Sequence, residues 1–122
     1  IISAYNSSPF FEFYCDDLKE VLFKEYSSLA NLNKALLEHI CNELGVTSNV
    51  ITSETYITIK DSELDLRSTL NPKKTFKGSD TYPRYIQIFE AKHGFQSNLS
   101  ILDLLFHEGP ESLNYLINLI NH

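Results

Sequence analysis

The sequence predicts a mainly α-helical fold, with two helical hairpins joined by an irregular middle segment that contains at most short strands. Three observations support this prediction. Apolar residues recur at steps of three and four along residues 29–44 and again along 113–120. Residues typical of helix starts and stops bracket these stretches. A strand-like run at residues 50–54 is β-branched but short, so we expect it to connect elements rather than to build a sheet.

The first hairpin is expected in the N-terminal part of the chain. Residues 1–6 have the pattern of the last turn of a helix, which then breaks. Ser8 is expected to cap the next helix, and Pro9 to occupy its first position. Ser28 is a suitable cap for a second helix, which Gly45 ends at a position that favours a left-handed backbone. The break between the two helices is short, which predicts antiparallel packing.

The middle of the chain is predicted to be irregular. Residues 61–70 have the pattern of a short helix, and 71–80 are expected to be a loop. Pro83 is expected to open a further short helix, which Gly94 ends. Its predicted apolar face consists of Tyr85, Ile88 and Phe89. The whole irregular region is longer than most loops of compact domains, and such loops are often functional.

The second hairpin is expected after Ser100. Ser100 and Asp103 form a pattern similar to a capping box, with Asp in the place of the usual Glu. We therefore expect Asp103 to cap the helix rather than to act as a general base. Gly109 and Pro110 then turn the chain, and Pro110 is expected to start the last helix. These four residues are predicted to be a structural motif.

Length and composition fit a single helical domain over residues 1–122. The hydrophobic share of 43% is enough for a core. No apolar run approaches the length of a membrane span and no signal peptide is evident, which predicts a cytoplasmic protein. The formal net charge of −6 argues against nucleic acid as a partner. Because the chain opens on Ile1 and contains no Met, we expect it to be a fragment of a longer protein.

Neither a cofactor nor a metal is predicted. The sequence has no Gly-rich phosphate loop, no Cys-x₂-Cys pair and no nucleophile elbow. Although His is the commonest general base, no His pair here has metal-ligand spacing. We therefore expect the four histidines to be structural or at the surface. They are His39, His93, His107 and His122.

Basic charge is concentrated in one irregular stretch. Residues 60–84 carry six Lys or Arg and four Asp or Glu, whereas the sequence on either side is acidic. Such cations can bind the phosphate or carboxylate of a nucleotide-sugar or acyl donor. The alternatives are a solvated loop for the Lys residues, and salt bridges to Asp61, Asp65 or Asp103 for the Arg residues. The candidate substrate-binding residues are Arg67, Lys73, Tyr82 and Arg84.

A longer motif resembles a known family. Residues 97–111, SNLSILDLLFHEGPE, are similar to a C-terminal block of the WbqC-like protein family, where it follows a segment similar to residues 85–95 here. AYNSSPFF from Ala4, the helix ending at Gly45 and DLRSTLNPKK from Asp65 also resemble family segments. His107 departs from the pattern, because related sequences carry Asn there. The resemblance covers nearly the whole chain.

The resemblance implies the C-terminal domain of an enzyme of O-antigen or other surface-polysaccharide biosynthesis. That enzyme would be a transferase that adds an amino-acid group such as glycine, or an acyl group, to a sugar. The family's more distinctive polar motifs lie in its N-terminal half, so no catalytic residue is carried over, and this fragment alone is not expected to be catalytic. The implied partners are an anionic sugar-nucleotide or acyl donor and the N-terminal half of the same protein.

The alternative is a non-catalytic binding or assembly module. In that case the apolar N-terminal segment, IISAYNSSPFFEFY, would dock on the N-terminal half or on a second copy of the chain. An exposed aromatic patch on this segment would mark such an interface.

Overall fold

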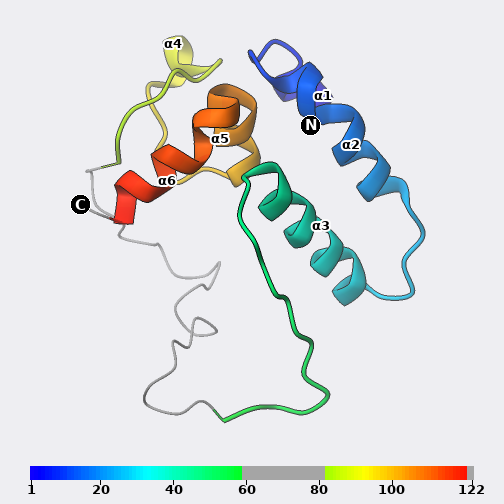
Figure 1. Cartoon of the computed structure of the whole chain (residues 1–122). Coiled ribbons are helices and arrows are strands. Elements are labelled where there is room, and N and C mark those ends of the chain that lie inside the picture. Colours follow the sequence, from blue (N-terminus) through cyan, green and yellow to red (C-terminus); the bar gives the residue numbers. More distant parts are fainter. Residues whose placement is uncertain (59–81, 121–122) are drawn as a thin grey trace.

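A computed structural model describes residues 1–58 and 82–120 of the chain, and these residues confirm the mainly helical fold (Figure 1). Within them there is no strand, and no helix is long and apolar enough to cross a membrane. The predicted helix at 61–70 and loop at 71–80 lie outside the described residues. The helices are α1 (Ile2–Tyr5), α2 (Phe11–Phe23), α3 (Leu29–Glu43), α4 (Glu90–His93), α5 (Ile101–Glu108) and α6 (Ser112–Ile120), with a 3₁₀ turn (Gly109–Glu111) before α6.

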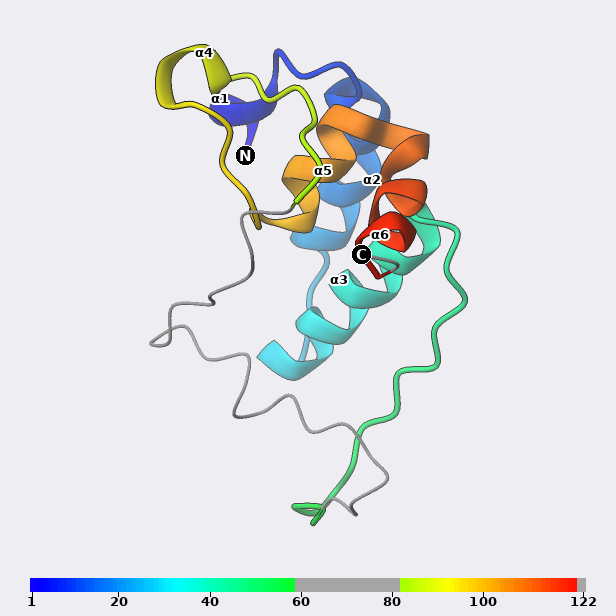
Figure 2. The same ribbon diagram turned by 90° about the vertical axis from the view of Figure 1, so that its left-hand side faces the viewer.

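The α2–α3 hairpin forms as predicted, and its two helices lie side by side (Figure 1 and Figure 2). The side chain of Ser28 accepts a hydrogen bond from the backbone N–H of Asn31 at 3.2 Å, and so caps α3. Gly45 follows the end of α3 with a φ of +71°, the left-handed backbone conformation that favours glycine. Local sequence signals therefore determine where α3 begins and ends.

The start of α2 differs from the prediction. The helix begins at Phe11, and its N-cap residue, Phe10, makes no side-chain cap hydrogen bond. The hydroxyl of Ser8 instead donates to the backbone carbonyl of Tyr5 at 2.6 Å, so it satisfies the end of α1 rather than the start of α2. The N–H of Phe10 donates to the carbonyl of Phe106 at 2.9 Å. This bond ties the α1–α2 junction to α5.

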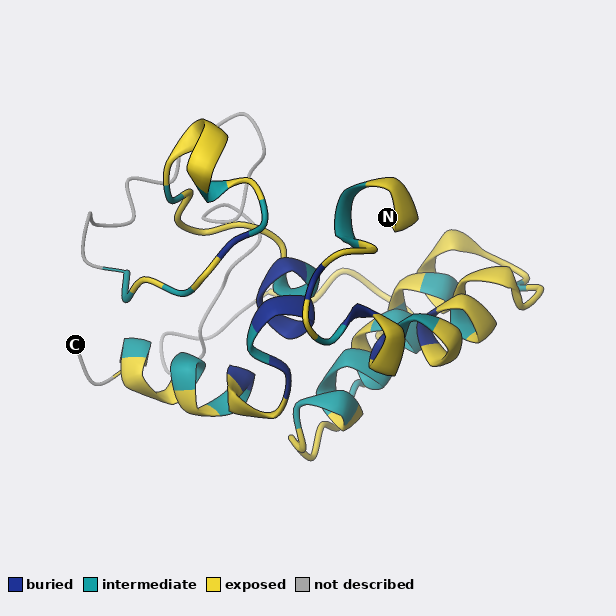
Figure 3. Ribbon diagram, turned by 90° about the horizontal axis from the view of Figure 1, so that it is seen from above, coloured by how far each residue is buried: buried dark blue, intermediate teal, exposed yellow. Residues whose placement is uncertain are grey.

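The core lies where α5 meets the α2–α3 hairpin. Its centre consists of five buried side chains: Phe11, Tyr14, Leu18, Leu105 and Phe106. The rings of Phe11 and Phe106 pack edge to face, with centroids 5.2 Å apart. Seen from above, the buried residues gather on α5, whereas the hairpin is largely half-buried or exposed (Figure 3). The short helix α5 is therefore the centre of the fold.

Gly109 makes the predicted turn between α5 and α6. Its φ is +53°, and a Cβ placed on it would lie 2.6 Å from the ring of Phe10. Both the backbone conformation and the close approach of that ring therefore require glycine. Pro110 falls within the 3₁₀ turn, and α6 begins at Ser112 rather than at Pro110 as predicted. The turn residues were predicted correctly, but the predicted start of the last helix lies two positions before the observed start of α6.

The helix predicted from Pro83 is wrong over most of its length, because only Glu90–His93 is helical. Gly94 ends this helix as predicted, with a φ of +71°. Before it, inward and outward side chains alternate. Tyr85 is half-buried and Gln87 is 7% exposed, whereas Arg84 and Ile86 lie at the surface. A period of two is incompatible with one buried helix face, so packing excludes the helix there.

Candidate functional site

A pocket of mixed polarity lies between α1, the segment around α4, and α5. Its volume is about 440 Å³, within the range of small-molecule pockets. The pocket draws on parts of the sequence that are far apart, since one wall comes from residue 5 and another from α5. The lining residues are Tyr5, Gln87, Ile88, Phe89, His93, Gly94, Gln96, Leu99, Asp103 and His107.

Asp103 is the buried carboxylate of this pocket, with 4% of its surface exposed. The hydroxyl of Tyr85 donates to its Oδ2 atom at 2.6 Å, and the amide of Gln87 lies 3.5 Å from the same atom. Ser100 caps α5 as predicted, accepting from the N–H of Leu102 at 3.3 Å. The predicted capping box is nevertheless wrong, because the carboxylate of Asp103 turns toward Tyr85 instead of the start of its own helix.

Two tyrosine hydroxyls face this carboxylate. Burial, followed by the hydrogen bond to Asp103, raises the pKa of Tyr85 far above its usual range. Burial also raises the pKa of Tyr5, and the charge of Asp103 and a hydrogen bond to it add to this effect. The Tyr85 hydroxyl therefore stays the donor to Asp103 well above neutral pH.

Gln87 fixes the rim of the pocket. Its side-chain amide donates to the carbonyl of Gln96 at 2.8 Å, and its side-chain oxygen accepts from the N–H of Gln96 at 2.9 Å. This pair of hydrogen bonds closes the chain into a loop that contains α4. The buried Gln87 is therefore a structural clamp, and the side chain of Gln96 remains at the exposed rim.

His107 is buried beside Asp103, and both of its ring nitrogens are engaged. Its Nε2 atom accepts from the backbone N–H of Ile88 at 3.0 Å, so this nitrogen carries no proton. Its Nδ1 atom lies 2.7 Å from the carbonyl of Asp103 and donates to it. No ring nitrogen is left to take a proton from a substrate. The structural interpretation of this histidine is confirmed, and the ring joins α5 to the segment before α4.

Of the residues predicted to bind substrate, the structure describes Tyr82 and Arg84, and neither lines this pocket. Arg84 is exposed, forms an ion pair with Glu90 and lies 5.6 Å from the ring centroid of Phe95. Its partner is thus in α4 and is none of the three aspartates considered from the sequence. Tyr82 is half-buried near Tyr115, whose pKa is raised by burial first and then by Tyr82. Arg67 and Lys73 lie outside the described residues.

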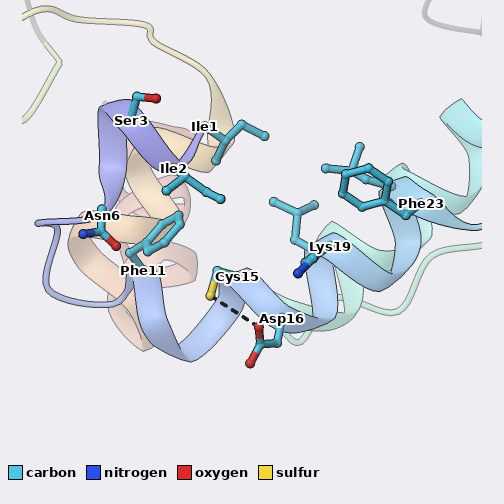
Figure 4. A pocket seen from close by; sticks show the side chains of 11 residues that line it. Ile1, Ile2, Ser3, Asn6, Phe11, Cys15, Asp16, Lys19 and Phe23 are labelled. Atoms are coloured by element: carbon cyan, nitrogen blue, oxygen red, sulfur yellow. Dashed lines mark hydrogen bonds between the residues drawn. The ribbon is translucent and has the colours of Figure 1, made fainter.

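An apolar groove lies between α1 and α2. Its volume is about 530 Å³, and its walls include Ile2, Phe11, Leu18 and Phe23 (Figure 4). Several of its side chains are strongly exposed, among them Ile2 at 68% and Phe23 at 80%. The apolar N-terminal segment considered from the sequence as a docking surface therefore does present an apolar groove to solvent.

The family comparison agrees with the motifs. The family model described as WbqC-like protein family matches residues 1–79 and 68–115. The chain belongs to the WbqC-like family. The matched ranges include Tyr5 as well as α4 and α5, so all the described pocket residues fall inside them. No curated protein and no solved structure matches the chain.

Proposed function

We propose that this WbqC-like chain forms the acceptor-binding part of a cytoplasmic transferase of surface-polysaccharide assembly, such as that of O-antigen. In this proposal the enzyme adds an amino-acid or acyl group to a sugar, and the sugar binds in the pocket beside Asp103. The observation that carries the proposal is this pocket, which combines one buried carboxylate with amide and aromatic walls. The reaction class comes from the resemblance to the WbqC-like family.

The lining of the pocket suits a polyhydroxylated ring. Asp103 can accept hydrogen bonds from sugar hydroxyl groups, and the side-chain amide of Gln96 can donate or accept at the rim. Phe89 is 50% exposed at the same rim and offers an apolar face to the ring. Pockets with apolar walls and a few placed polar groups are the usual sites of small ligands.

In this proposal the donor binds outside the pocket, at the basic stretch of residues 60–84. Among the described residues, neither Lys nor Arg lines the pocket, so the phosphate or carboxylate of a donor finds no cation there. The basic stretch at 60–84 remains the proposed donor contact, with Arg67 and Lys73 ahead of Arg84, because Glu90 already pairs with Arg84. Tyr82 lies within the same stretch. This division places acceptor and donor on different parts of the chain.

Ligand-observed NMR with a panel of glucose, galactose and mannose tests the acceptor pocket. We expect saturation transfer to at least one sugar in the wild-type chain and its loss in Phe89→Ala. Ile86→Ala is the matched control, because Ile86 is 81% exposed in the same segment but does not line the pocket. Equal transfer in wild type and Phe89→Ala would contradict the assignment, as would no transfer to any sugar in the wild-type chain.

The groove between α1 and α2 favours a second candidate function, an assembly module that self-associates. Sedimentation velocity over a range of concentrations tests it, with Phe23→Ser as the groove variant. Phe13→Ser is the control, because Phe13 is 72% exposed but does not line the groove. Self-association that is lost in Phe23→Ser alone supports this candidate, and a monomer at every concentration contradicts it.

A further inference from the structure

We infer that the pocket beside Asp103 prefers a ligand that carries a primary ammonium group, so that an amine binds there more tightly than a neutral sugar or an anion. The inference rests on the proposed function, which it deepens by naming the charge of the ligand. It is carried by the charge balance, the hydrogen-bond capacity and the aromatic walls of the pocket.

The charge balance of the pocket is negative. Asp103 is its one Asp or Glu among the described lining residues, and no Lys or Arg accompanies it. Its nearest basic group among the described residues, Nδ1 of His107, lies 3.7 Å from Oδ1. That nitrogen donates to a backbone carbonyl instead, in a neutral ring. A buried carboxylate without a cation is costly, and a ligand cation would offset that cost.

The hydrogen-bond capacity of Asp103 is not used up. An ionised carboxylate offers about four acceptor positions. Tyr85 and Gln87 approach Oδ2, and Tyr5 lies near enough for the charge of Asp103 to raise its pKa. At least one position therefore remains for a ligand. An ammonium group supplies three donors and a positive charge, and charge-assisted bonds of this kind are roughly twice as strong as neutral ones.

The walls beside the carboxylate also suit a cation. Tyr5 comes from one side of the pocket and Phe89 from another, and both line it together with Asp103. The faces of aromatic rings attract cations, most strongly where water is excluded. Because the pocket offers no ammonium or guanidinium group of its own among the described residues, nothing of that kind would offset the repulsion of an anionic ligand by Asp103.

Two sources could supply the ammonium group, an amino sugar as acceptor or the amino group of an amino-acid donor. Each source has a neutral counterpart of nearly the same shape. Glucosamine is compared with glucose and N-acetylglucosamine, and glycinamide is compared with acetamide. Affinities are measured by chemical-shift titration of the wild-type chain at neutral pH. We expect the charged member of at least one comparison to bind about tenfold more tightly than its neutral counterparts, the effect of one charge-assisted hydrogen bond.

The outcomes separate the inference from the function on which it rests. A preference confined to glucosamine identifies an amino-sugar acceptor and supports both the inference and the proposed acceptor pocket. A preference confined to glycinamide supports the inference but identifies an amino-acid donor in this pocket, which overturns the proposed placement of acceptor and donor. Equal affinities within both comparisons, the three sugars and the two amides, overturn the ammonium inference while leaving the sugar pocket standing. Binding of none of the five compounds overturns the inference together with the proposed pocket.

A variant that removes the charge of Asp103 tests whether this residue causes the preference for the charged ligand. Asp103→Asn keeps an oxygen that can accept from Tyr85 but removes the negative charge, so we expect it to abolish the preference for the charged ligand. Ile86→Ala should keep it, because Ile86 is 81% exposed and does not line the pocket. A preference that persists in a folded Asp103→Asn chain would overturn the assignment to Asp103. If this variant fails to fold, the paired affinities of the wild-type chain still decide the inference.

Discussion

The α2–α3 hairpin and α5 contrast in pattern and in burial. α3 has the clearest periodic pattern of apolar residues in the chain, yet none of its residues is buried. α5 is about half as long, and it buries five residues, two of them polar: Asp103, Leu104, Leu105, Phe106 and His107. The strength of an amphipathic pattern thus predicts that a helix forms, but it does not predict how deeply the helix is buried.

The contrast has a physical reason. α3 packs one face on α2, which leaves the rest of its surface to solvent. α5 lies between α2, the α1–α2 junction, the segment before α4, and α6, so it is enclosed on several sides (Figure 2). A helix in that position can hold polar groups only when they are hydrogen-bonded. Within the described residues, no buried side-chain polar atom lacks a partner.

The largest effect is expected from truncating matched leucines in the two regions. Leu105 on α5 is 1% exposed, so Leu105→Ala should lower the free energy of unfolding by roughly 3–5 kcal/mol through lost burial and a cavity. Leu37 on α3 is 50% exposed, and Leu37→Ala should cost less than about 1 kcal/mol. Chemical denaturation measures both. Equal losses would show that the two regions contribute alike, contrary to the contrast in burial.

The next effect concerns two glycines with left-handed backbone. Gly109→Ala combines backbone strain with a clash against Phe10, so we expect a loss of about 3 kcal/mol. Gly45 has nothing within 4 Å of its would-be Cβ, so Gly45→Ala should cost only the strain, about 1 kcal/mol. Thermal melting of the two variants compares them. A Gly109→Ala loss no larger than that of Gly45→Ala would mean that Phe10 moves aside freely.

A smaller effect is expected from two tyrosine hydroxyls. Tyr85→Phe removes the bond to Asp103 and should cost about 2 kcal/mol, because the acceptor is a carboxylate. Tyr26→Phe removes a 2.8 Å bond to the carbonyl of Val21, a neutral acceptor, and should cost about 1 kcal/mol. Urea denaturation at pH 7 gives both values. Identical losses would argue that Asp103 exerts no charge effect on its donor.

The Tyr85 contribution should also depend on pH. The pKa of Tyr85 is raised in the folded chain above its ordinary value of 10, by burial first and then by the bond to Asp103. Folding therefore favours the neutral hydroxyl, and the stabilisation is complete below pH 10 and declines as the pH rises above it. The difference in unfolding free energy between wild type and Tyr85→Phe should shrink in that range. A difference that stays constant or grows would contradict the raised pKa.

Local features of the fold could be predicted from the sequence, because their causes lie within a few residues. Ser28 caps the helix that follows it, and Gly45, Gly94 and Gly109 mark turns or helix ends through their own backbone freedom. The Ser8 prediction failed because the hydroxyl bonds back to the carbonyl of Tyr5. The N–H of Phe10, at the start of α2, bonds to Phe106 on α5, a contact that the local sequence does not indicate. The family motif was likewise readable, since it is a continuous run.

The pocket could not be predicted, because its contacts join residues far apart in the chain. Asp103 and Tyr85 are 18 positions apart, and nothing near Asp103 in sequence indicates that partner. Apolar side chains are usually buried and polar ones exposed, but the segment before α4 shows the opposite, because Ile86 is exposed while Gln87 is buried. Hydrophobicity alone therefore gives the wrong inward face. The hydrogen bonds of Gln87 to Gln96, together with its approach to Asp103, explain why a polar side chain is inside.

The position of Tyr5 in the pocket wall has a consequence for protein engineering. Transplanting α5 and its turn into another helical protein would carry the family motif along but leave the pocket behind. The groups around Asp103 come from α1 and from the segment before α4, and the bond between Phe10 and Phe106 holds α1 in place. A functional graft would therefore have to include both the beginning and the end of the described chain.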